Sequence, residues 1–261
     1  MEIKINSLVT RKSYNHDTIF KVLNIKDNIC YLKGQNIRLY ADSPIEDLVI
    51  YNSNTDDNFE STIEEESPLD RNEYFYIPAK ILHCDGDSDY LIRCLNFYKK
   101  NKIKAIGKII KEEELPNKID KLLKDYNPNI LIITGHDAYY SKKGSKENLN
   151  NYKNSKYFCE SVKKARIYEK DHDKLVIIAG ACQSNYEELI KSGANYASSP
   201  KRVNIHALDP AIIASTIALT NKMETINLIE LLNKTKYGSD GMGGIVGNGL
   251  MYVGYPRWLK Q

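Results

Sequence analysis

Two short apolar segments that each end at a glycine most constrain the fold of this chain. One covers residues 130–138 (ILIITGHDA) and the other covers residues 174–185 (KLVIIAGACQSN). Runs of four to six branched apolar residues without polar alternation indicate strands buried on both faces, which are typical of a parallel sheet with helices on both sides. Ligands bind such sheets beyond the carboxyl ends of the strands. The residues after each glycine are therefore the first candidates for a functional site.

A histidine follows the first segment and a cysteine follows the second. If the two strands are parallel neighbours, His136 and Cys182 leave the same edge of the sheet, where they would form a nucleophile and its base. Their separation of 46 residues (182 − 136) leaves room for a crossover helix, since a strand–helix–strand unit needs roughly 30 residues. A similar order, histidine and then cysteine about 50 residues later, occurs in caspase-type peptidases. We therefore favour catalysis by this pair over a purely structural role for Cys182.

Composition narrows the class of protein. A hydrophobic content of 42% and a charged content of 27% in 261 residues are ordinary for a globular chain of one or two domains. A net charge of +3 is too small to predict nucleic-acid binding, and no apolar run approaches the roughly 20 residues of a membrane span. The chain begins without the basic and apolar pattern of a secretion signal, so we expect a cytoplasmic location. Five irregularly spaced cysteines predict neither a disulfide framework nor a zinc site, and we expect no metal or cofactor.

Composition along the chain predicts two domains and a linker. Residues 1–52 contain four or five short strand patterns separated by polar or glycine turns, which predict a small SH3-like β-barrel, with Asp42 and Pro44 in its closing turn. Residues 53–72 hold seven carboxylates and no base before Arg71, which predicts an acidic flexible linker. A site of self-cleavage or regulation is the alternative interpretation of that linker. Residues 73–261 form the third part.

Strand and helix patterns alternate in residues 73–261 and predict a three-layer α/β/α sheet of mostly parallel strands, caspase-like or Rossmann-like. We expect strands over residues 74–84, 104–110, 129–134, 174–179 and 203–208. We expect helices over residues 88–101, 119–126, 155–169, 185–193 and 223–235, and another that begins at 209–212. Seven glycines between Gly238 and Gly254 indicate either a mobile loop near a substrate groove or a loop packed on the sheet.

Several motifs resemble the YabG family of sporulation-specific peptidases. They are GHDA at 135–138, GACQSN at 180–185, ASSPKRVNIHALDP at 197–210, and two N-terminal segments at 9–22 and 32–48. The resemblance covers nearly the whole chain. It implies a cysteine endopeptidase that acts in the mother cell or forespore, associated with the developing spore, and that processes spore coat and germination-related proteins by cleaving after Arg. It also implies that His136 and Cys182 are the catalytic pair. Kinship to caspase-like peptidases is weaker, because Asp137 rather than glycine follows His136.

Residue chemistry suggests how such a pair would work. A free thiol has a pKa of about 8.5, so Cys182 needs His136 to take its proton and later to donate it to the leaving amine. The backbone N–H groups of Cys182 and Asp137, with Gly135 beside them, are candidates for holding the oxyanion. Asp137 is also a candidate for orienting His136, although their adjacency makes that geometry awkward. Binding of an Arg side chain requires a carboxylate, for which the candidates are Asp209, which we place first, and Asp240, Asp85 and Asp87.

Two other functions remain open from the sequence. One is a non-enzymatic α/β scaffold or interaction module of spore assembly, for which nothing requires a reactive thiol. The other is a small-molecule hydrolase or amidase that uses the same two residues in an enclosed pocket. Under the peptidase interpretation the partners are spore protein substrates, and the acidic linker is a candidate for self-cleavage.

Overall fold

The computed structural model describes residues 3–51 and 74–257. The chain divides into two compact units, Met1–Ile63 and Glu64–Gln261, which are described separately below. The predicted acidic linker at 53–72 lies outside the described residues, so its character and the predicted domain boundaries stay predictions.

The N-terminal unit is an antiparallel sheet of five strands in the order β4-β3-β2-β1-β5. The strands are β1 Leu8–Arg11, β2 Phe20–Lys26, β3 Ile29–Gly34, β4 Tyr40–Pro44 and β5 Leu48–Ile50, with short 3-10 helices η1 Lys12–Tyr14 and η2 Ile45–Asp47. Asp27 and Asn28 have positive φ angles of 51° and 60°, which suits the tight turn that joins β2 to β3. Buried residues on one face form the core: Val9, Phe20, Val22, Cys30, Leu32 and Leu48. The predicted short strands are present, and the SH3-like character stays a prediction.

The closing turn predicted at Asp42 and Pro44 is wrong. Both residues lie in β4, where Asp42 pairs with Tyr31 and Pro44 pairs with Ile29. Pro44 is the last residue of β4, which is an edge strand, and proline is tolerated there because no further ladder bond needs its missing N–H.

The C-terminal unit contains a six-stranded sheet in the order β12-β11-β10-β9-β7-β8. Its strands are β7 Ile81–Asp85, β8 Ala105–Ile109, β9 Ile130–Thr134, β10 Val176–Ala179, β11 Tyr196–Ser198 and β12 Met242–Gly244. Every neighbouring pair from β8 to β11 is parallel, and only β12 runs antiparallel, to β11. All residues of β7, β9 and β10 are buried, as the apolar runs of β9 and β10 predict, and β7 buries His83 and Asp85 as well. The prediction of an α/β fold with a mostly parallel sheet is confirmed.

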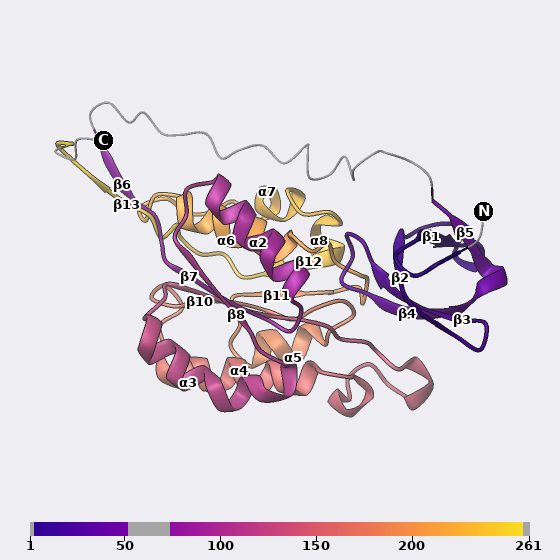
Figure 1. Cartoon of the computed structure of the whole chain (residues 1–261). Helices are drawn as coiled ribbons and strands as arrows, with labels where there is room; N and C mark the ends of the chain where they lie inside the picture. The colour runs from indigo at the N-terminus through magenta and orange to yellow at the C-terminus, as the bar shows by residue number, and fades with distance from the viewer. Residues whose placement is uncertain (1–2, 52–73, 258–261) are drawn as a thin grey trace. The chain divides into compact units, whose positions relative to one another are not determined.

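Helices cover both faces of this sheet (Figure 1). On one face lie α2 Ser88–Lys100, α6 Asp209–Leu219 and α7 Leu228–Asn233, and on the other lie α3 Leu115–Tyr126, α4 Ser155–Tyr168 and α5 Tyr186–Lys191. Short helical turns are η3 Glu112–Glu114, η4 Ser141–Lys143, η5 Leu149–Asn151 and α8 Gly238–Gly241. The main core joins the sheet to α3, α4 and α5, and Cys159 belongs to it. On the opposite face, α6 buries ten of its residues, which its almost uninterrupted apolar sequence favours.

Three predicted elements differ from the structure. The strand expected over 74–84 is two strands, β6 Phe75–Ile77 and β7, because Pro78 breaks the run between them. Residues 203–208 are not a strand, and the fifth parallel strand is the shorter segment Tyr196–Ser198. The glycine-rich segment is not a single loop: its first part forms β12 at the edge of the six-stranded sheet, and its last part forms β13 Tyr252–Gly254, which pairs with β6 in a separate two-stranded sheet.

The sheet reverses its strand order at β7. The chain goes from β7 to its outer neighbour β8 and then returns to β9 on the other side of β7. Crevices at such reversals, beyond the carboxyl ends of the strands, are where open α/β sheets bind ligands. The residues that follow β7 and β9 are therefore of special interest.

Candidate active site

His136 and Cys182 emerge at the same edge of the sheet. Strands β9 and β10 are parallel neighbours in which Ile133 pairs with Ala179. Gly180 N–H extends the ladder by one bond to Ile133 O, at 3.0 Å. His136 lies two residues beyond the end of β9, and Cys182 lies three residues beyond the end of β10. Both residues therefore stand on the segments that leave the carboxyl ends of adjacent strands.

Two hydrogen bonds connect the segment after His136 to the segment after Cys182. Ser184 Oγ donates to Asp137 Oδ2 at 2.9 Å, and Tyr139 N–H donates to Gln183 Oε1 at 3.3 Å. A one-residue shift of either segment would break these bonds. The two segments are therefore fixed relative to each other by their own side chains.

The Asp137 carboxylate holds this arrangement together. Its Oδ1 accepts Asn154 N–H at 2.7 Å and Ala138 N–H at 2.9 Å, and its Oδ2 accepts the hydroxyl groups of Ser184 and Ser155. Burial raises the pKa of Asp137, and these four hydrogen bonds oppose that rise. We predicted Asp137 as oxyanion or orienting support. The structure places its side chain in a clamp between the end of β9, the start of α4 and the Cys182 turn.

The Cys182 turn is framed by the last residue of β11 and the segment that follows it. Ser198 Oγ and Ser199 Oγ donate to Ala181 O at 2.8 and 3.2 Å. Ile205 N–H donates to Cys182 Sγ at 3.2 Å, and the thiol is buried. The thiol in turn donates to Ile205 O at 3.8 Å, so the sulfur both accepts from and donates to the backbone of Ile205.

The residue after Cys182 has an unusual backbone conformation. Gln183 has a φ of 58°, in the left-handed region that a non-glycine residue rarely adopts. Its N–H donates to Val203 O at 3.1 Å and Ser199 Oγ at 2.9 Å, and its side-chain amide donates to Asn204 Oδ1 at 3.2 Å. Such a conformation persists only where surrounding contacts impose it, and it recurs at functional sites.

Gly180 lets the chain turn sharply between β10 and Cys182. Its φ is 102°, and a Cβ atom at this position would lie 2.4 Å from Ser198 Oγ and 2.8 Å from Leu189 Cδ1. Only glycine fits these two constraints together. The glycine that ends the apolar run is thus required by the path to the cysteine.

His136 is held at both its ring and its backbone. Its ring Nε2 lies 3.0 Å from Asp87 Oδ2, and its backbone N–H donates to Glu112 Oε1 at 2.7 Å. Asn154 Nδ2 donates to His136 O at 2.7 Å, and the Tyr90 ring lies 5.8 Å from the imidazole, centroid to centroid. The imidazole is paired with a carboxylate from the segment that follows the neighbouring strand β7, at the reversal of strand order.

Sequence reasoning missed Glu112. Its carboxylate lies so close to two glycines that a side chain at either position would clash with it. A Cβ atom at Gly86 would be 2.4 Å from Glu112 Oε1, and a Cβ atom at Gly135 would be 2.2 Å from the same oxygen. Gly135, predicted to support the oxyanion, therefore makes room for this carboxylate. The sequence signal for Glu112 is weak, because it stands in the acidic run Glu112–Glu114, which resembles an ordinary solvated helix start.

The four candidate carboxylates for an Arg pocket differ in their surroundings. Asp85 and Asp209 are fully buried: Asp85 Oδ1 accepts Asp87 N–H, and Asp209 accepts the N–H groups of His206 and Lys236. Asp87 caps α2 and pairs with His136. Asp240 is more than half exposed and forms an ion pair with Lys201.

All four carboxylates lie at the carboxyl edge of the sheet. Asp85 ends β7, Asp87 follows it, and Asp240 precedes the antiparallel strand β12. Asp209 begins α6, whose far end bonds through Ala218 O to Ala79, before β7, so its start lies toward the carboxyl edge. The strand predicted over residues 203–208, whose carboxyl end would have placed Asp209 at this edge, is absent.

The other cysteines lie in cores. Burial raises the pKa of Cys84 to about 12 and that of Cys159 to about 11, and it also raises the pKa of Cys30. Thiols with such values carry little thiolate near neutral pH.

Within residues 3–51 and 74–257, no three His, Cys, Asp or Glu side chains gather as a metal-ligand set.

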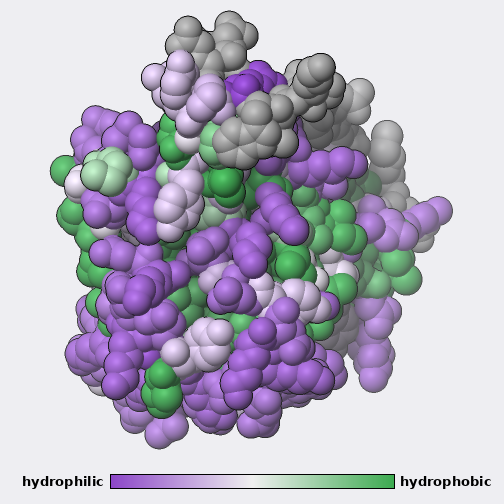
Figure 2. Space-filling view, turned by 90° about the vertical axis from the view of Figure 1, so that its left-hand side faces the viewer, coloured by the Kyte–Doolittle hydropathy of each residue, from purple (hydrophilic) through white to green (hydrophobic). Residues whose placement is uncertain are grey.

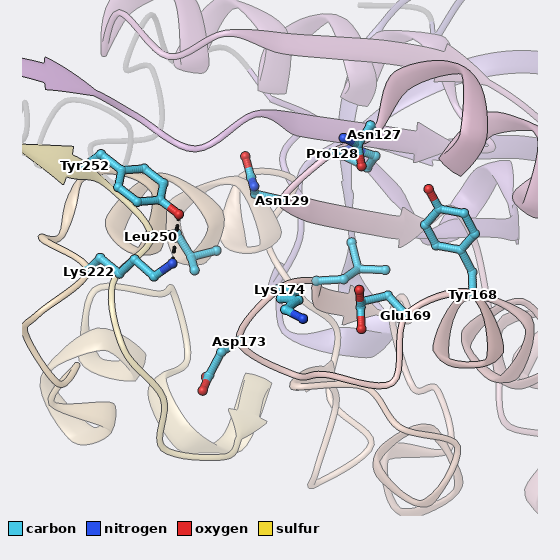
Figure 3. A pocket seen from close by; sticks show the side chains of 11 residues that line it. Asn127, Pro128, Asn129, Tyr168, Glu169, Asp173, Lys174, Lys222, Leu250 and Tyr252 are labelled. Atoms are coloured by element: carbon cyan, nitrogen blue, oxygen red, sulfur yellow. Dashed lines mark hydrogen bonds between the residues drawn. The ribbon is translucent and has the colours of Figure 1, made fainter.

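A cavity of about 520 Å³ lies at the opposite edge of the sheet. Asn127, Pro128 and Asn129, which precede β9, line one side, and Lys174 and Leu175, which precede β10, line another (Figure 3). Lys222 Nζ donates to Tyr252 Oη at 2.8 Å on its rim. This cavity is formed by the amino ends of the strands, so it is separate from His136 and Cys182. Hydrophilic residues predominate on the face of the molecule shown in Figure 2.

Comparison with known proteins identifies the family. The family described as YabG peptidase U57 matches residues 4–68 and 50–256. The sporulation-specific protease YabG of Bacillus subtilis (strain 168) is 41% identical over 286 aligned positions, which cover 98% of this chain and 99% of that protein. The chain belongs to the YabG peptidase family. It is therefore a peptidase with protein substrates, and the resemblance seen in the sequence motifs is confirmed. In the part of the chain that the structure describes, no helix is long and apolar enough to cross a membrane.

Proposed function

We propose that this YabG family member is a cysteine endopeptidase in which Cys182 is the nucleophile and His136 is its base. The observation that carries the proposal is their emergence from adjacent parallel strands at one edge, on segments joined by two hydrogen bonds. Cys182 alone among the five cysteines follows a strand of this edge at a turn with left-handed backbone, and its sulfur receives a backbone N–H. This combination distinguishes it from Cys30, Cys84 and Cys159, whose burial raises their pKa.

In the proposed reaction, His136 takes the proton of Cys182 as the sulfur attacks the carbonyl carbon of the substrate peptide bond. The backbone N–H of Cys182, with that of Asp137 as a second donor, stabilises the oxyanion. His136 then donates its proton to the leaving amine, which produces a thioester, and water hydrolyses the thioester to return free Cys182. The α5 helix begins near the thiol, with Asn185 as its N-cap, but its six residues contribute only a small dipole.

We further propose that the substrates are spore coat and germination-related proteins, cut after Arg in the mother cell or forespore. The relative's name supports the sporulation context. Arg recognition needs a carboxylate, and Asp209 remains the first candidate, with Asp240, Asp85 and Asp87 as the others. A small SH3-like barrel at residues 1–52 would position the substrate or restrict its access.

The test compares single cysteine variants on a recombinant spore-protein substrate. We expect Cys182→Ala and His136→Ala to abolish cleavage, and Cys159→Ala and Cys30→Ala to retain it, as followed by mass spectrometry of the products. The same spectra show whether the cut follows Arg. Asp209→Asn should lower the rate of cleavage at Arg far more than it lowers the rate at which a small reagent alkylates Cys182. Cleavage by Cys182→Ala at the parent rate would exclude the cysteine mechanism.

A further inference from the structure

Asp87 forms a polar link between two neighbouring strands at the strand-order reversal. It follows β7, and its Oδ2 lies 3.0 Å from Nε2 of His136, which follows β9. The His136 and Asp87 side chains are only 14% and 5% exposed, so water screens this pair weakly. An ionised carboxylate can only accept hydrogen bonds, so Nε2 carries the hydrogen in this pair. The proton-accepting nitrogen of the neutral ring is then Nδ1.

The backbone around Asp87 fixes its carboxylate. Its Oδ1 accepts the N–H groups of Asp89 and Tyr90 at 3.0 and 3.3 Å as the N-cap of α2, while its own N–H donates to Asp85 Oδ1 at 2.9 Å. The two oxygens thus have different partners, one the helix and the other the imidazole. Rotation of the carboxylate toward solvent would break the cap, so the helix holds Oδ2 in line with His136.

A second row of groups supports the same arrangement. Asp85 Oδ2 lies 3.6 Å from His83 Nε2, and His83 Nδ1 lies 2.9 Å from Tyr98 Oη, all fully or nearly fully buried. On the other side of His136, Glu112 Oε1 accepts its backbone N–H. Carboxylates therefore fix both the main chain and the ring of His136.

We propose that Asp87 is the positioning residue of the active site: it fixes the His136 tautomer and ring orientation so that Nδ1 serves as the base for Cys182. The inference rests on the proposed cysteine mechanism, and it assigns to Asp87 a role different from the Arg pocket considered above. The carboxylate also stabilises the imidazolium that forms when His136 takes the thiol proton. It touches neither the substrate nor the reacting sulfur.

The test uses Asp87→Asn in the full-length chain. Asparagine caps helices as well as aspartate does, so the α2 cap is kept. Its side-chain amide donates to Nε2, however, which moves the ring hydrogen to Nδ1 and removes the base. We expect kcat to fall about 100-fold or more while KM stays within about two-fold. In ¹⁵N spectra of histidine-labelled protein, the His136 hydrogen should move from Nε2 to Nδ1.

Asp171→Asn is a matched control. The Asp171 carboxylate likewise accepts the N–H two residues on, at 2.9 Å from Asp173 N, but it precedes β10 at the opposite edge of the sheet. This variant should keep the parent kcat. If Asp87→Asn does not fold, Asp87→Ser serves instead, because serine caps α2 but is too short to reach His136, and the same loss of kcat is expected.

The outcomes separate this inference from the proposed function. A folded Asp87→Asn or Asp87→Ser enzyme with kcat within a few-fold of the parent overturns the inference, and so does a parent spectrum with the hydrogen on Nδ1. Cleavage by Cys182→Ala at the parent rate overturns the cysteine mechanism instead. The tautomer measurement, repeated in the Cys182→Ala chain, tests the effect of Asp87 on His136 independently of catalysis.

Discussion

Replacement of Asp137 by alanine should destabilise the C-terminal unit and disorganise the site at once. The carboxylate accepts hydrogen bonds from Ala138, Asn154, Ser155 and Ser184. The last three residues are at most 7% exposed, so in Asp137→Ala their donors lose an acceptor that water does not replace. At about 1–1.5 kcal/mol for each of the three donors the loss is about 3–4.5 kcal/mol. Removal of a desolvated charge offsets part of this loss, which leaves about 2–4 kcal/mol.

The assay is thermal unfolding followed by circular dichroism, with cleavage measured on the same samples. For a unit of this size, a loss of about 3 kcal/mol lowers the melting temperature by about 6–12 °C. Cleavage should fall at temperatures where the protein is still folded, because Ser184 is released from the segment that carries His136. A melting temperature within about 2 °C of the parent would refute the claim that this carboxylate clamps the two segments together.

The pH dependence of folding stability provides a second, independent test of the role of Asp137. Burial raises the folded-state pKa of Asp137 above the unfolded value of about 4, so in between those values the folded chain binds more protons than the unfolded chain. The contribution of this group to stability is therefore fully present below about pH 4 and is lost as pH rises through the folded-state pKa. Asp137→Asn lacks this titration. The stability of the parent minus that of Asp137→Asn should decrease with rising pH in this window, and an increase would contradict the raised pKa.

Three further predictions follow from local geometry. Gly180→Ala should lose about 2–3 kcal/mol because of its positive φ and the contact with Ser198, whereas Gly247→Ala, with nothing within 4 Å of the added Cβ, should be nearly neutral in urea unfolding. Burial raises the pKa of Cys84 to about 12 and that of Cys159 to about 11, so iodoacetamide should label neither thiol at neutral pH until urea is added. Rapid labelling of either residue in the folded chain, located by mass spectrometry, would count against their burial. Arg202→Lys should lower the melting temperature, because a single ammonium cannot replace the guanidinium bonds to Tyr152, Glu187 and the carbonyl groups of Ser199 and Pro200. These bonds together contribute about 1–2 kcal/mol to stability, and an unchanged melting temperature would show that they add nothing.

The sequence predicted the parts of the fold that depend on local patterns. Unbroken runs of branched residues located β9 and β10, and glycines marked where their chains turn. It failed at residues 203–208, where Ile205 and Ala207 are buried although the segment does not belong to the sheet, and where the backbone N–H of Ile205 bonds to Cys182 Sγ instead of to a neighbouring strand. It also missed the break at Pro78, although proline inside a strand pattern argues for one.

The site was predicted in part for the same reason. His136 and Cys182 carry their own signal, since each follows a buried strand. The partners of His136 carry none, because Asp87 resembles an ordinary helix cap and Glu112 resembles a solvated acid. Their role depends on which strands become neighbours. That information is in the strand order β10-β9-β7-β8, which no local pattern encodes.

The strand order also explains why the proposed base stands on β9. Asp87 lies 49 residues before His136, and Cys182 lies 46 residues after it (182 − 136), so neither is near it in sequence. In the sheet, β9 has β7 on one side and β10 on the other. A residue beyond the end of β9 can therefore meet an orienting carboxylate from one neighbour and a thiol from the other. An imidazole suits this middle position because its two nitrogens face different directions and have different roles. Exchange of the histidine and cysteine positions would put the base beyond an outer strand of the three, out of reach of Asp87, so His136→Cys/Cys182→His should be inactive even if it folds.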